Sequence, residues 1–317
     1  MNTLQHKKII FLDRSTFPKN IKFNNLNFKN TWKNYNFTEK KDIGTRIREA
    51  NIVVTNKVNL NKLNLNNAKN LELIAITATG TNIIDLEFCK KRNIAVCNLR
   101  DYASTSVAEH VMTLILSLSK NIKGLEEDIK NKLWQKKKVF ALLSREISDL
   151  NNKNIGIIGK GSIGKKVGKL AKAFGMNNSF ISVRNSNKNE LREFLHNLDY
   201  LSIHCPLNEK TNGLISIKEL KAMKKSSIII NTARGGIINE RDLVYAIKNK
   251  VIAGAGIDVT TEEPPKINHV YYQIIEKSNF LWTPHTAWAS NETLQRAINQ
   301  LISNINSFYG GRKKNLV

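Results

Sequence analysis

The 317-residue sequence lacks any apolar run of the roughly 20 residues that a membrane-spanning helix needs. Its first residues, MNTLQHKKIIFLD, contain neither a long apolar segment nor a small-residue cleavage site, so they do not indicate a secretory signal peptide. Cysteine is scarce: Cys89, Cys97 and Cys205 are odd in number and form no CxxC pair. We therefore expect reduced, mostly buried thiols and a cytoplasmic protein without a membrane partner.

Acidic residues are also few, because 50 lysines and arginines against 26 aspartates and glutamates leave a net charge of +24. Such an excess can indicate nucleic-acid binding. The lysines, however, are spread over the whole chain beside abundant asparagine and isoleucine, a composition that the codon bias of an AT-rich genome would produce. No basic helix with interleaved aromatic residues and no zinc-finger spacing is present, so we expect no nucleic-acid partner.

The length predicts two domains, and a hydrophobic share of 41% is ample for their cores. Short apolar runs alternate with amphipathic stretches along the chain, which predicts an α/β fold with parallel, doubly wound sheets. The expected strands are 8–13, 51–55, 71–78, 94–98, 155–159, 179–183, 200–205, 227–233, 252–259 and 280–284. We place the domain boundary near residue 100, before an apolar helix over 104–121. A single last helix over 291–308 cannot form a hydrophobic core by itself, so we expect it to pack back on the first domain.

The segment GKGSIG (159–164) lies between an apolar strand pattern and an amphipathic helix pattern, as a dinucleotide-binding turn requires. Gly159 permits the tight turn, Gly161 lets the backbone approach a pyrophosphate, and Gly164 lets the helix pack on the strand. The N–H groups at the start of that helix, around Ser162 and Ile163, suit phosphate oxygens. The alternative is an ordinary glycine-rich strand–helix turn.

The residues beyond this turn bear on which nicotinamide cofactor is used. A turn that binds NAD is expected to be followed, about twenty residues later, by an acid that holds the ribose 2′-hydroxyl. No aspartate or glutamate occurs over 151–189, and Ser182 and Arg184 stand in that region instead. A guanidinium can bind a 2′-phosphate that a carboxylate would repel, so the sequence favours NADP. The alternative is an NAD enzyme that uses Ser182 as a weaker ribose partner.

Charged and titratable residues follow three of the later strands: Arg234, then Asp258 and Glu263, then His285. The carboxyl ends of parallel strands are where ligands bind, so we expect these residues to converge near the cofactor. Arg234 could bind the carboxylate and carbonyl of a 2-oxo acid, and His285 could protonate the alkoxide that hydride transfer forms. Glu263 could hydrogen-bond the other ring nitrogen of His285. Each alone is more often a surface charge or a structural histidine.

The other histidines predict no metal site. His204 and Cys205 are adjacent and cannot both face one ion from a strand, and no third ligand is near. His110 follows an acid on an apolar helix and is expected to be structural. Three more histidines are expected to face solvent: His6, His196 and His269.

Along nearly its whole length the sequence resembles the D-2-hydroxyacid dehydrogenases. The most specific matching stretches are ATGTNIIDL (78–86), VCNLRDYASTSVAEH (96–110), GKGSIG (159–164), HCPLNEKTNGLI (204–215), NTARGG (231–236), GAGIDVTTEEPP (254–265) and TPHTAWAS (283–290). The resemblance implies a substrate-orienting role for Arg234, an acid–base pair of Glu263 and His285, and a nicotinamide-amide contact for Asp258. It also implies that the backbone of Thr79 and Gly80 binds the substrate carboxylate. The remaining implied cofactor contacts are Cys205, Pro206, Thr232 and Ala233.

The resemblance further implies a flavodoxin-like substrate domain (1–100 with 287–317) and a Rossmann-like dinucleotide-binding domain (101–286) around a cleft. The helix and arm over 104–150 would form a homodimer. Three stretches are most similar to the glycerate dehydrogenase (hydroxypyruvate reductase) branch: the linker LWQKKKVFALLSREI (133–147), TATGTN (77–82) and HTAWAS (285–290). The last of these contains Trp288, for which the resemblance implies a substrate contact. Two positions depart from the family pattern: Lys160 replaces an apolar residue, and Ser182 stands where the ribose-binding acid is expected. Both bear on the identity of the cofactor and not on the type of reaction.

We therefore expect an NAD(P)-dependent oxidoreductase that reduces a small 2-oxo acid such as hydroxypyruvate or glyoxylate. One alternative is another enzyme of the same family, of the D-lactate or phosphoglycerate type. The other is a non-enzymatic, dinucleotide-sensing interaction protein. Such a sensor would have no need to retain Arg234, Glu263 and His285 together.

Overall fold

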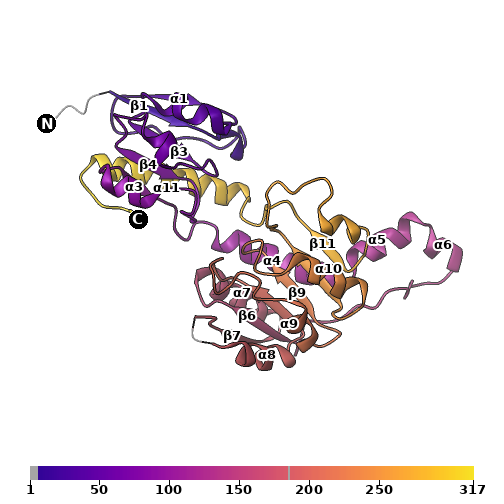
Figure 1. Cartoon of the computed structure of the whole chain (residues 1–317). Coiled ribbons are helices and arrows are strands. Elements are labelled where there is room, and N and C mark those ends of the chain that lie inside the picture. The colour runs from indigo at the N-terminus through magenta and orange to yellow at the C-terminus, as the bar shows by residue number, and fades with distance from the viewer. Residues whose placement is uncertain (1–5, 185) are drawn as a thin grey trace. The chain divides into compact units, whose positions relative to one another are not determined.

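The computed structural model describes residues 6–184 and 186–317, which form two compact units (Figure 1). The first unit is Met1–Ala103 with Ala289–Val317, and the second is Ser104–Trp288. Each unit holds one parallel sheet, which confirms the predicted α/β class. No helix in the described part of the chain is long and apolar enough to cross a membrane.

The first unit is built on a five-stranded sheet with the order β2-β1-β3-β4-β5. Its strands are β1 (Lys7–Phe11), β2 (Asn30–Asn34), β3 (Ile52–Thr55), β4 (Leu73–Ile76) and β5 (Ala95–Cys97). Every residue of β3 and β4 is buried, as parallel strands covered on both faces require. The edge strand β2 was not predicted, because its sequence NTWKN is polar and mostly exposed.

The helices of the first unit include the last helix of the chain. They are η1 (Arg14–Thr16), η2 (Lys40–Asp42), α1 (Ile43–Ile47), α2 (Lys62–Leu65), α3 (Leu86–Lys91) and α11 (Asn291–Tyr309). Helix α11 contacts β4, and Gln295 on it exchanges two hydrogen bonds with the backbone of Lys22. The C-terminal helix therefore packs on the sheet formed by the first hundred residues.

The second unit is built on a six-stranded sheet with the order β11-β10-β9-β8-β6-β7. Its strands are β6 (Asn154–Ile158), β7 (Asn177–Ile181), β8 (Tyr200–Ile203), β9 (Ile228–Asn231), β10 (Gly254–Ile257) and β11 (Phe280–Trp282). The chain moves from β6 outward to β7 and then returns to place β8 on the other side of β6. Such a reversal of strand order opens a crevice at the carboxyl ends of β6 and β8, where doubly wound sheets bind ligands.

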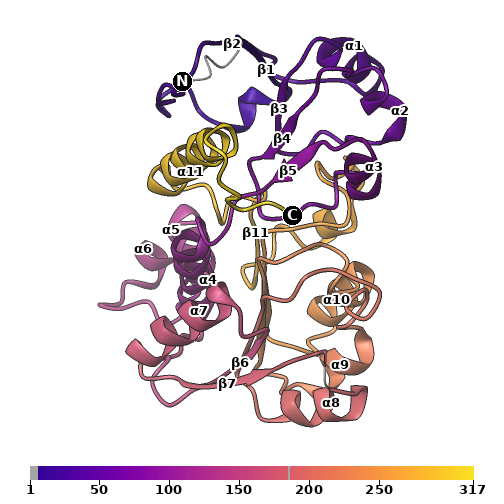
Figure 2. The same ribbon diagram turned by 90° about the vertical axis from the view of Figure 1, so that its left-hand side faces the viewer.

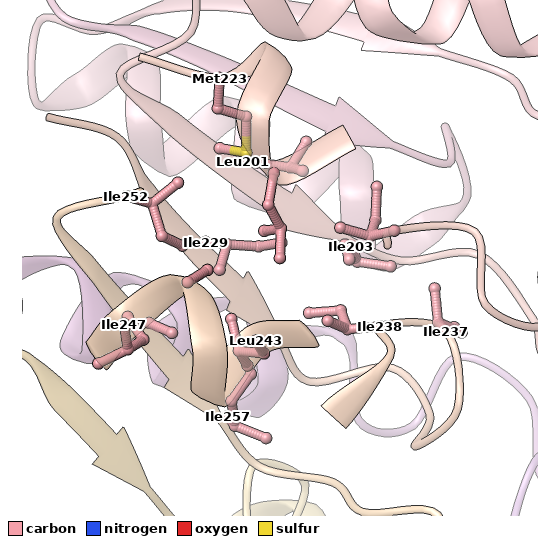
Figure 3. Packing of buried hydrophobic residues seen from close by; sticks show 14 of the residues in the cluster. Leu201, Ile203, Met223, Ile229, Ile237, Ile238, Leu243, Ile247, Ile252 and Ile257 are labelled. Carbon is pink, nitrogen blue, oxygen red and sulfur yellow. The ribbon is translucent and has the colours of Figure 1, made fainter. Parts of the chain in front are cut away.

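Helices cover both faces of this second sheet, as Figure 2 shows. They are α4 (Ser104–Ser119), α5 (Ile122–Lys130), α6 (Leu133–Lys137), α7 (Ser162–Ala173), α8 (Lys188–His196), α9 (Ile217–Ala222), α10 (Glu240–Lys248) and η3 (Val270–Gln273). Helices α4 and α7 enclose one core with β6 and β9, and α8, α9 and α10 enclose another on the opposite face. In the second core, Leu243 and Ile247 of α10 lie near Ile229 and Ile257 of the sheet (Figure 3).

Candidate active site

The glycine turn joins the end of β6 to the start of α7. Gly159 has φ +100°, and a Cβ there would lie 2.7 Å from the carbonyl oxygen of His204. A Cβ on Gly164 would overlap the carbonyl oxygen of Gly159. A Cβ on Gly161, by contrast, would meet no atom within 4 Å, and no side chain caps the helix that begins at Ser162. The turn thus leaves open space in front of helix N–H groups, which fits a dinucleotide pyrophosphate.

The loop after β9 contains Thr232 and Ala233. The Asn231 side chain shapes this loop, because it accepts a hydrogen bond from the Ala233 N–H and donates one to the Arg234 carbonyl. Thr232 is 8% exposed, and within the described residues its buried Oγ1 has no hydrogen-bond partner. A buried hydroxyl is costly unless a partner satisfies it, so this position also fits a bound polar group.

The carboxyl end of β7 carries positive charge. Strand β7 ends at Ile181, two residues before the predicted end, so Ser182 and Arg184 follow the strand and are exposed. The Lys160 ammonium lies 5.5 Å from the centroid of the Phe180 ring on this strand. Lys160 and Arg184 are thus both cations, and no carboxylate occurs anywhere from the turn through residue 184.

Cys205 and Pro206 follow β8 beside the glycine turn. Burial raises the pKa of the Cys205 thiol to about 11, so the group is neutral at ordinary pH. Cys89 and Cys97 are likewise free and buried. Among residues 6–184 and 186–317, no group of three or more histidine, cysteine or acidic side chains could hold a metal ion.

His285 and Glu263 form a hydrogen-bonded pair at the carboxyl edge of the sheet. The ring Nδ1 of His285 lies 2.6 Å from Oε2 of Glu263, and the other carboxylate oxygen accepts a hydrogen bond from the Thr260 N–H at 3.1 Å. His285 has φ +55°, a left-handed conformation that non-glycine residues seldom adopt and that is common at functional sites. The carboxylate therefore fixes the ring through Nδ1, which leaves Nε2 as the nitrogen for a ligand.

Asp258 organises the segment that carries His285. Its buried carboxylate accepts hydrogen bonds from the Thr283 hydroxyl (2.5 Å), the Thr286 N–H (2.9 Å) and the Ala287 N–H (2.9 Å). The carbonyl of Asp258 also accepts the N–H of His285. These four bonds determine the path of the chain on both sides of His285.

His110 lies beside this clamp, which its place on an apolar helix did not predict. Its Nε2 is 3.0 Å from the Thr283 hydroxyl and 3.8 Å from a carboxylate oxygen of Asp258. Burial lowers the pKa of His110, and the nearby Asp258 charge opposes that shift. No sequence pattern signals this contact, because it depends on the packing of α4 against β11.

Arg234 is exposed at the end of β9, and its Nη1 donates to the carbonyl of Ala233 at 2.6 Å. A Cβ on the next residue, Gly235, would overlap the backbone of Thr260. The loops after β9 and β10 therefore touch, which only glycine allows at this point. This contact brings the loop of Arg234 against the loop of Glu263.

A pocket of about 580 Å³ lies beside the His285–Glu263 pair. Its apolar wall is formed by Pro264, Pro265, Tyr272 and Trp282. His269 packs behind this wall, with its ring centroid 5.5 Å from that of Trp282 and its Nε2 3.0 Å from a carboxylate oxygen of Glu240. The prediction that His269 faces solvent is therefore wrong, whereas His6 and His196 are exposed as predicted.

The expected substrate contacts fall in both units. Thr79 and Gly80 follow β4 in the first unit, and the side chain of Asn98 donates a hydrogen bond to the Thr79 carbonyl at 2.8 Å. Trp288 is the last residue of the second unit.

Comparison with known proteins identifies the family. Residues 112–287 match the model of the D-isomer specific 2-hydroxyacid dehydrogenase NAD binding domain. The chain is 36% identical to a glycerate dehydrogenase of Methylorubrum extorquens, over 98% of this chain and 99% of that protein. It is 31% identical to a hydroxypyruvate reductase of Blautia hydrogenotrophica, over 88% of each.

Solved structures agree with this assignment. An acyclic imino acid reductase in complex with NADPH and D-Arg matches with a TM-score of 0.80 and 25% identity, covering 98% of this chain and 99% of that one. A D-lactate dehydrogenase from Aquifex aeolicus with NAD and lactic acid matches with a TM-score of 0.77 and 25% identity, covering 96% of each. The chain belongs to the D-isomer specific 2-hydroxyacid dehydrogenase family and is an oxidoreductase that uses a nicotinamide cofactor and acts on a CH–OH group.

Proposed function

We propose that this enzyme reduces a small 2-oxo acid, with hydroxypyruvate as the first candidate and glyoxylate as the second, to the D-2-hydroxy acid. The observation that carries the proposal is the 2.6 Å contact between His285 and Glu263 at the carboxyl edge of a dinucleotide-binding sheet. The names of the relatives, glycerate dehydrogenase and hydroxypyruvate reductase, support the choice of substrate.

The proposed chemistry assigns each side chain one task. A nicotinamide cofactor, when bound, would supply the hydride for reduction or accept it in the reverse direction. Arg234 binds the carboxylate and carbonyl of the substrate, because a planar guanidinium can hold two oxygens at once. His285 donates a proton from Nε2 to the carbonyl oxygen as the alkoxide forms, and Glu263 orients the ring and stabilises its charged form.

The first unit is proposed to be the substrate domain, and the second the dinucleotide-binding domain. The backbone N–H groups at Thr79 and Gly80 bind the substrate carboxylate, and Trp288 contributes a further substrate contact. The proposed cofactor contacts are Gly159, Gly161, Ser162, Ile163, Gly164, Ser182, Arg184, Cys205, Pro206, Thr232, Ala233, Arg234, Asp258 and His285.

Steady-state kinetics test the proposed reaction directly. Hydroxypyruvate, glyoxylate and pyruvate are each assayed with NADH and with NADPH, following loss of the reduced cofactor. We expect the highest kcat/KM with hydroxypyruvate. Absence of turnover with every combination would overturn the proposal, and a preference for pyruvate would change the substrate assignment but not the reaction.

We propose NADPH as the preferred cofactor. Support comes from the exposed Arg184 and Ser182 directly after β7 and from Lys160 over the Phe180 ring, with no acid over 151–189. A 2′-phosphate would meet a guanidinium there rather than a carboxylate. A kcat/KM ratio strongly in favour of NADH in the same assays would overturn this preference.

We also propose that the enzyme is a homodimer assembled through the arm over 104–150. Figure 1 shows α5 and α6 extending away from the sheet of their own unit. The arm exposes Phe140 (98%) and Leu143 (87%), two large apolar side chains. Further exposed apolar side chains on the arm are Ile122, Ile129, Trp134, Val139 and Ile147. Apolar surface gathered in this way is typical of an interface.

A further inference from the structure

The last residues of the chain lie along β5 in the first unit. Leu316 pairs with Cys97 in an antiparallel bridge, and the Val317 N–H donates to the carbonyl of Val96 at 3.0 Å. The Asn98 N–H in turn donates to the carbonyl of Asn315 at 3.2 Å. The C-terminal segment thus extends the sheet beyond its β5 edge, next to Asn98.

A chain of three asparagine side chains runs from this segment to the loop after β4. Asn315 Nδ2 donates to Asn304 Oδ1 (3.0 Å), Asn304 Nδ2 to the Asn98 carbonyl (3.0 Å), and Asn98 Nδ2 to the Thr79 carbonyl (2.8 Å). Asn98 is 6% exposed and Asn304 is 2% exposed. Buried amides cost free energy unless they are hydrogen-bonded, so the bonds that Asn98 and Asn304 make favour a single arrangement, in which Asn304 holds the backbone of Asn98 and Asn315 holds the side chain of Asn304.

The Asn98 side chain controls the direction of one backbone N–H. The carbonyl of Thr79 and the N–H of Gly80 belong to the same planar trans peptide, so they point in opposite directions. A donor that fixes the Thr79 carbonyl therefore also fixes the Gly80 N–H. The Leu99 N–H holds the preceding carbonyl, that of Ala78, at 3.0 Å, so two consecutive peptides of the loop are fixed from the same strand end.

The side-chain amide of Asn98 acts as a hydrogen-bond donor and not as an acceptor. Its Oδ1 is buried and has no hydrogen-bond partner in the described part of the chain. Rotating the amide by half a turn would place this oxygen against the Thr79 carbonyl oxygen, and the two acceptors would repel each other. The donated hydrogen bond to Thr79 is thus the feature that this position supplies.

We propose that Asn98 is a positioning residue that aims the Gly80 N–H at the substrate carboxylate, and that Asn304 on α11 and Asn315 on the C-terminal segment hold Asn98 in place. The proposal rests on the proposed function, in which the Thr79–Gly80 backbone binds that carboxylate. It links Asn304 and Asn315 to substrate binding, although neither side chain touches the substrate.

Two variants of the full-length enzyme test the proposal, with one matched control. Asn98→Asp keeps the size of the side chain but removes the donor and sets a carboxylate against the Thr79 carbonyl. Asn315→Gly removes the amide yet suits the left-handed backbone of residue 315 (φ +52°). Lys314→Ala is the control, because Lys314 bonds Ser303 on the same segment outside the asparagine chain.

Losing a hydrogen bond of this kind weakens binding by about tenfold, so KM for the 2-oxo acid should rise about tenfold in Asn98→Asp and about threefold in Asn315→Gly. The value of kcat and the KM for the cofactor should stay within about twofold, because a purely binding interaction is lost. Hydrogen–deuterium exchange of the peptide covering 77–84 should become faster in both variants. The control should match the wild type in every measurement.

If both variants keep the wild-type substrate KM and the wild-type exchange of this loop, and the wild-type enzyme is active, the role of Asn98 is overturned and the proposed function is not. A different outcome is that exchange of this loop is faster in the variants but the wild-type enzyme turns over no 2-oxo acid. That result would overturn the proposed function, and with it the substrate role of Asn98. If Asn98→Asp does not fold, Asn315→Gly decides the matter, because its site is on the surface segment.

Discussion

His204 allows a quantitative prediction about the acid stability of the cofactor-binding unit. Its carbonyl oxygen lies against the glycine turn at Gly159, and its ring Nε2 lies 2.8 Å from the hydroxyl of Ser202. Burial lowers the pKa of His204 from 6.5 to about 3, because the surrounding protein does not solvate an imidazolium. The folded unit therefore holds this histidine in its neutral form.

The pH window follows from these two values. Above about pH 6.5 the ring is neutral in both folded and unfolded chains, and its contribution to stability is fully present. As the pH falls from there toward about 3, only the unfolded chain takes up the proton, and stability is lost. At pH 5 the loss would reach about 2 kcal/mol for complete burial, and the partial exposure of the residue reduces this to about 1–2 kcal/mol.

Urea unfolding measures this loss, followed by tryptophan fluorescence at about pH 7.5 and about pH 5. Three of the four tryptophans belong to the same unit as His204, namely Trp134, Trp282 and Trp288. Between the two pH values the wild type should lose about 1–2 kcal/mol more than His204→Gln does. His196→Gln, at an exposed position, should behave as the wild type. Equal losses in the wild type and His204→Gln would refute the reasoning.

Three predictions concern the proposed activity and assembly. His285→Gln should lower kcat by about 10²–10⁴-fold, because the proton donor is lost. The reduced cofactor should still bind in a fluorescence titration, because the other proposed cofactor contacts remain; near-normal turnover would exclude His285 as the acid. Arg184→Ala should lower kcat/KM for NADPH about tenfold more than kcat/KM for NADH. The control Lys169→Ala removes one exposed charge on α7 and should not change the ratio of the two kcat/KM values. An equal effect of Arg184→Ala on both cofactors would exclude a 2′-phosphate contact. Phe140→Asp should convert the proposed dimer to a monomer in light-scattering mass measurements, and a monomeric wild type would remove the proposed interface.

The features of the fold and site that sequence predicted are those determined locally or by a general rule of topology. The glycine turn was recognisable because the strand, the three glycines and the helix are contiguous. Arg234, Glu263 and His285 could be grouped because parallel strands end at one edge of a sheet. The polar edge strand β2 carries no apolar pattern and was missed.

Contacts chosen by packing between distant segments were not predictable. Asn304 and Asn98 are 206 residues apart in the chain, and no pattern in either segment refers to the other. The contact of His110 with Thr283 spans 173 residues. His269 was expected to face solvent, but it packs against the aromatic ring of Trp282 and the carboxylate of Glu240, which lie elsewhere in the chain.

The two tasks assigned to Asp258 are compatible within one carboxylate. An ionised carboxylate offers about four acceptor positions, two on each oxygen. Oδ1 already accepts from Thr283 and Thr286, whereas among the described residues Oδ2 accepts only from Ala287, so one position remains on Oδ2. A nicotinamide amide N–H at that position would displace no protein donor, and because the Asp258 side chain is 0% exposed, its approach would require the atoms that cover the carboxylate to move. The same group would then clamp the segment of His285 and contact the cofactor, so cofactor placement and proton-donor placement depend on one side chain.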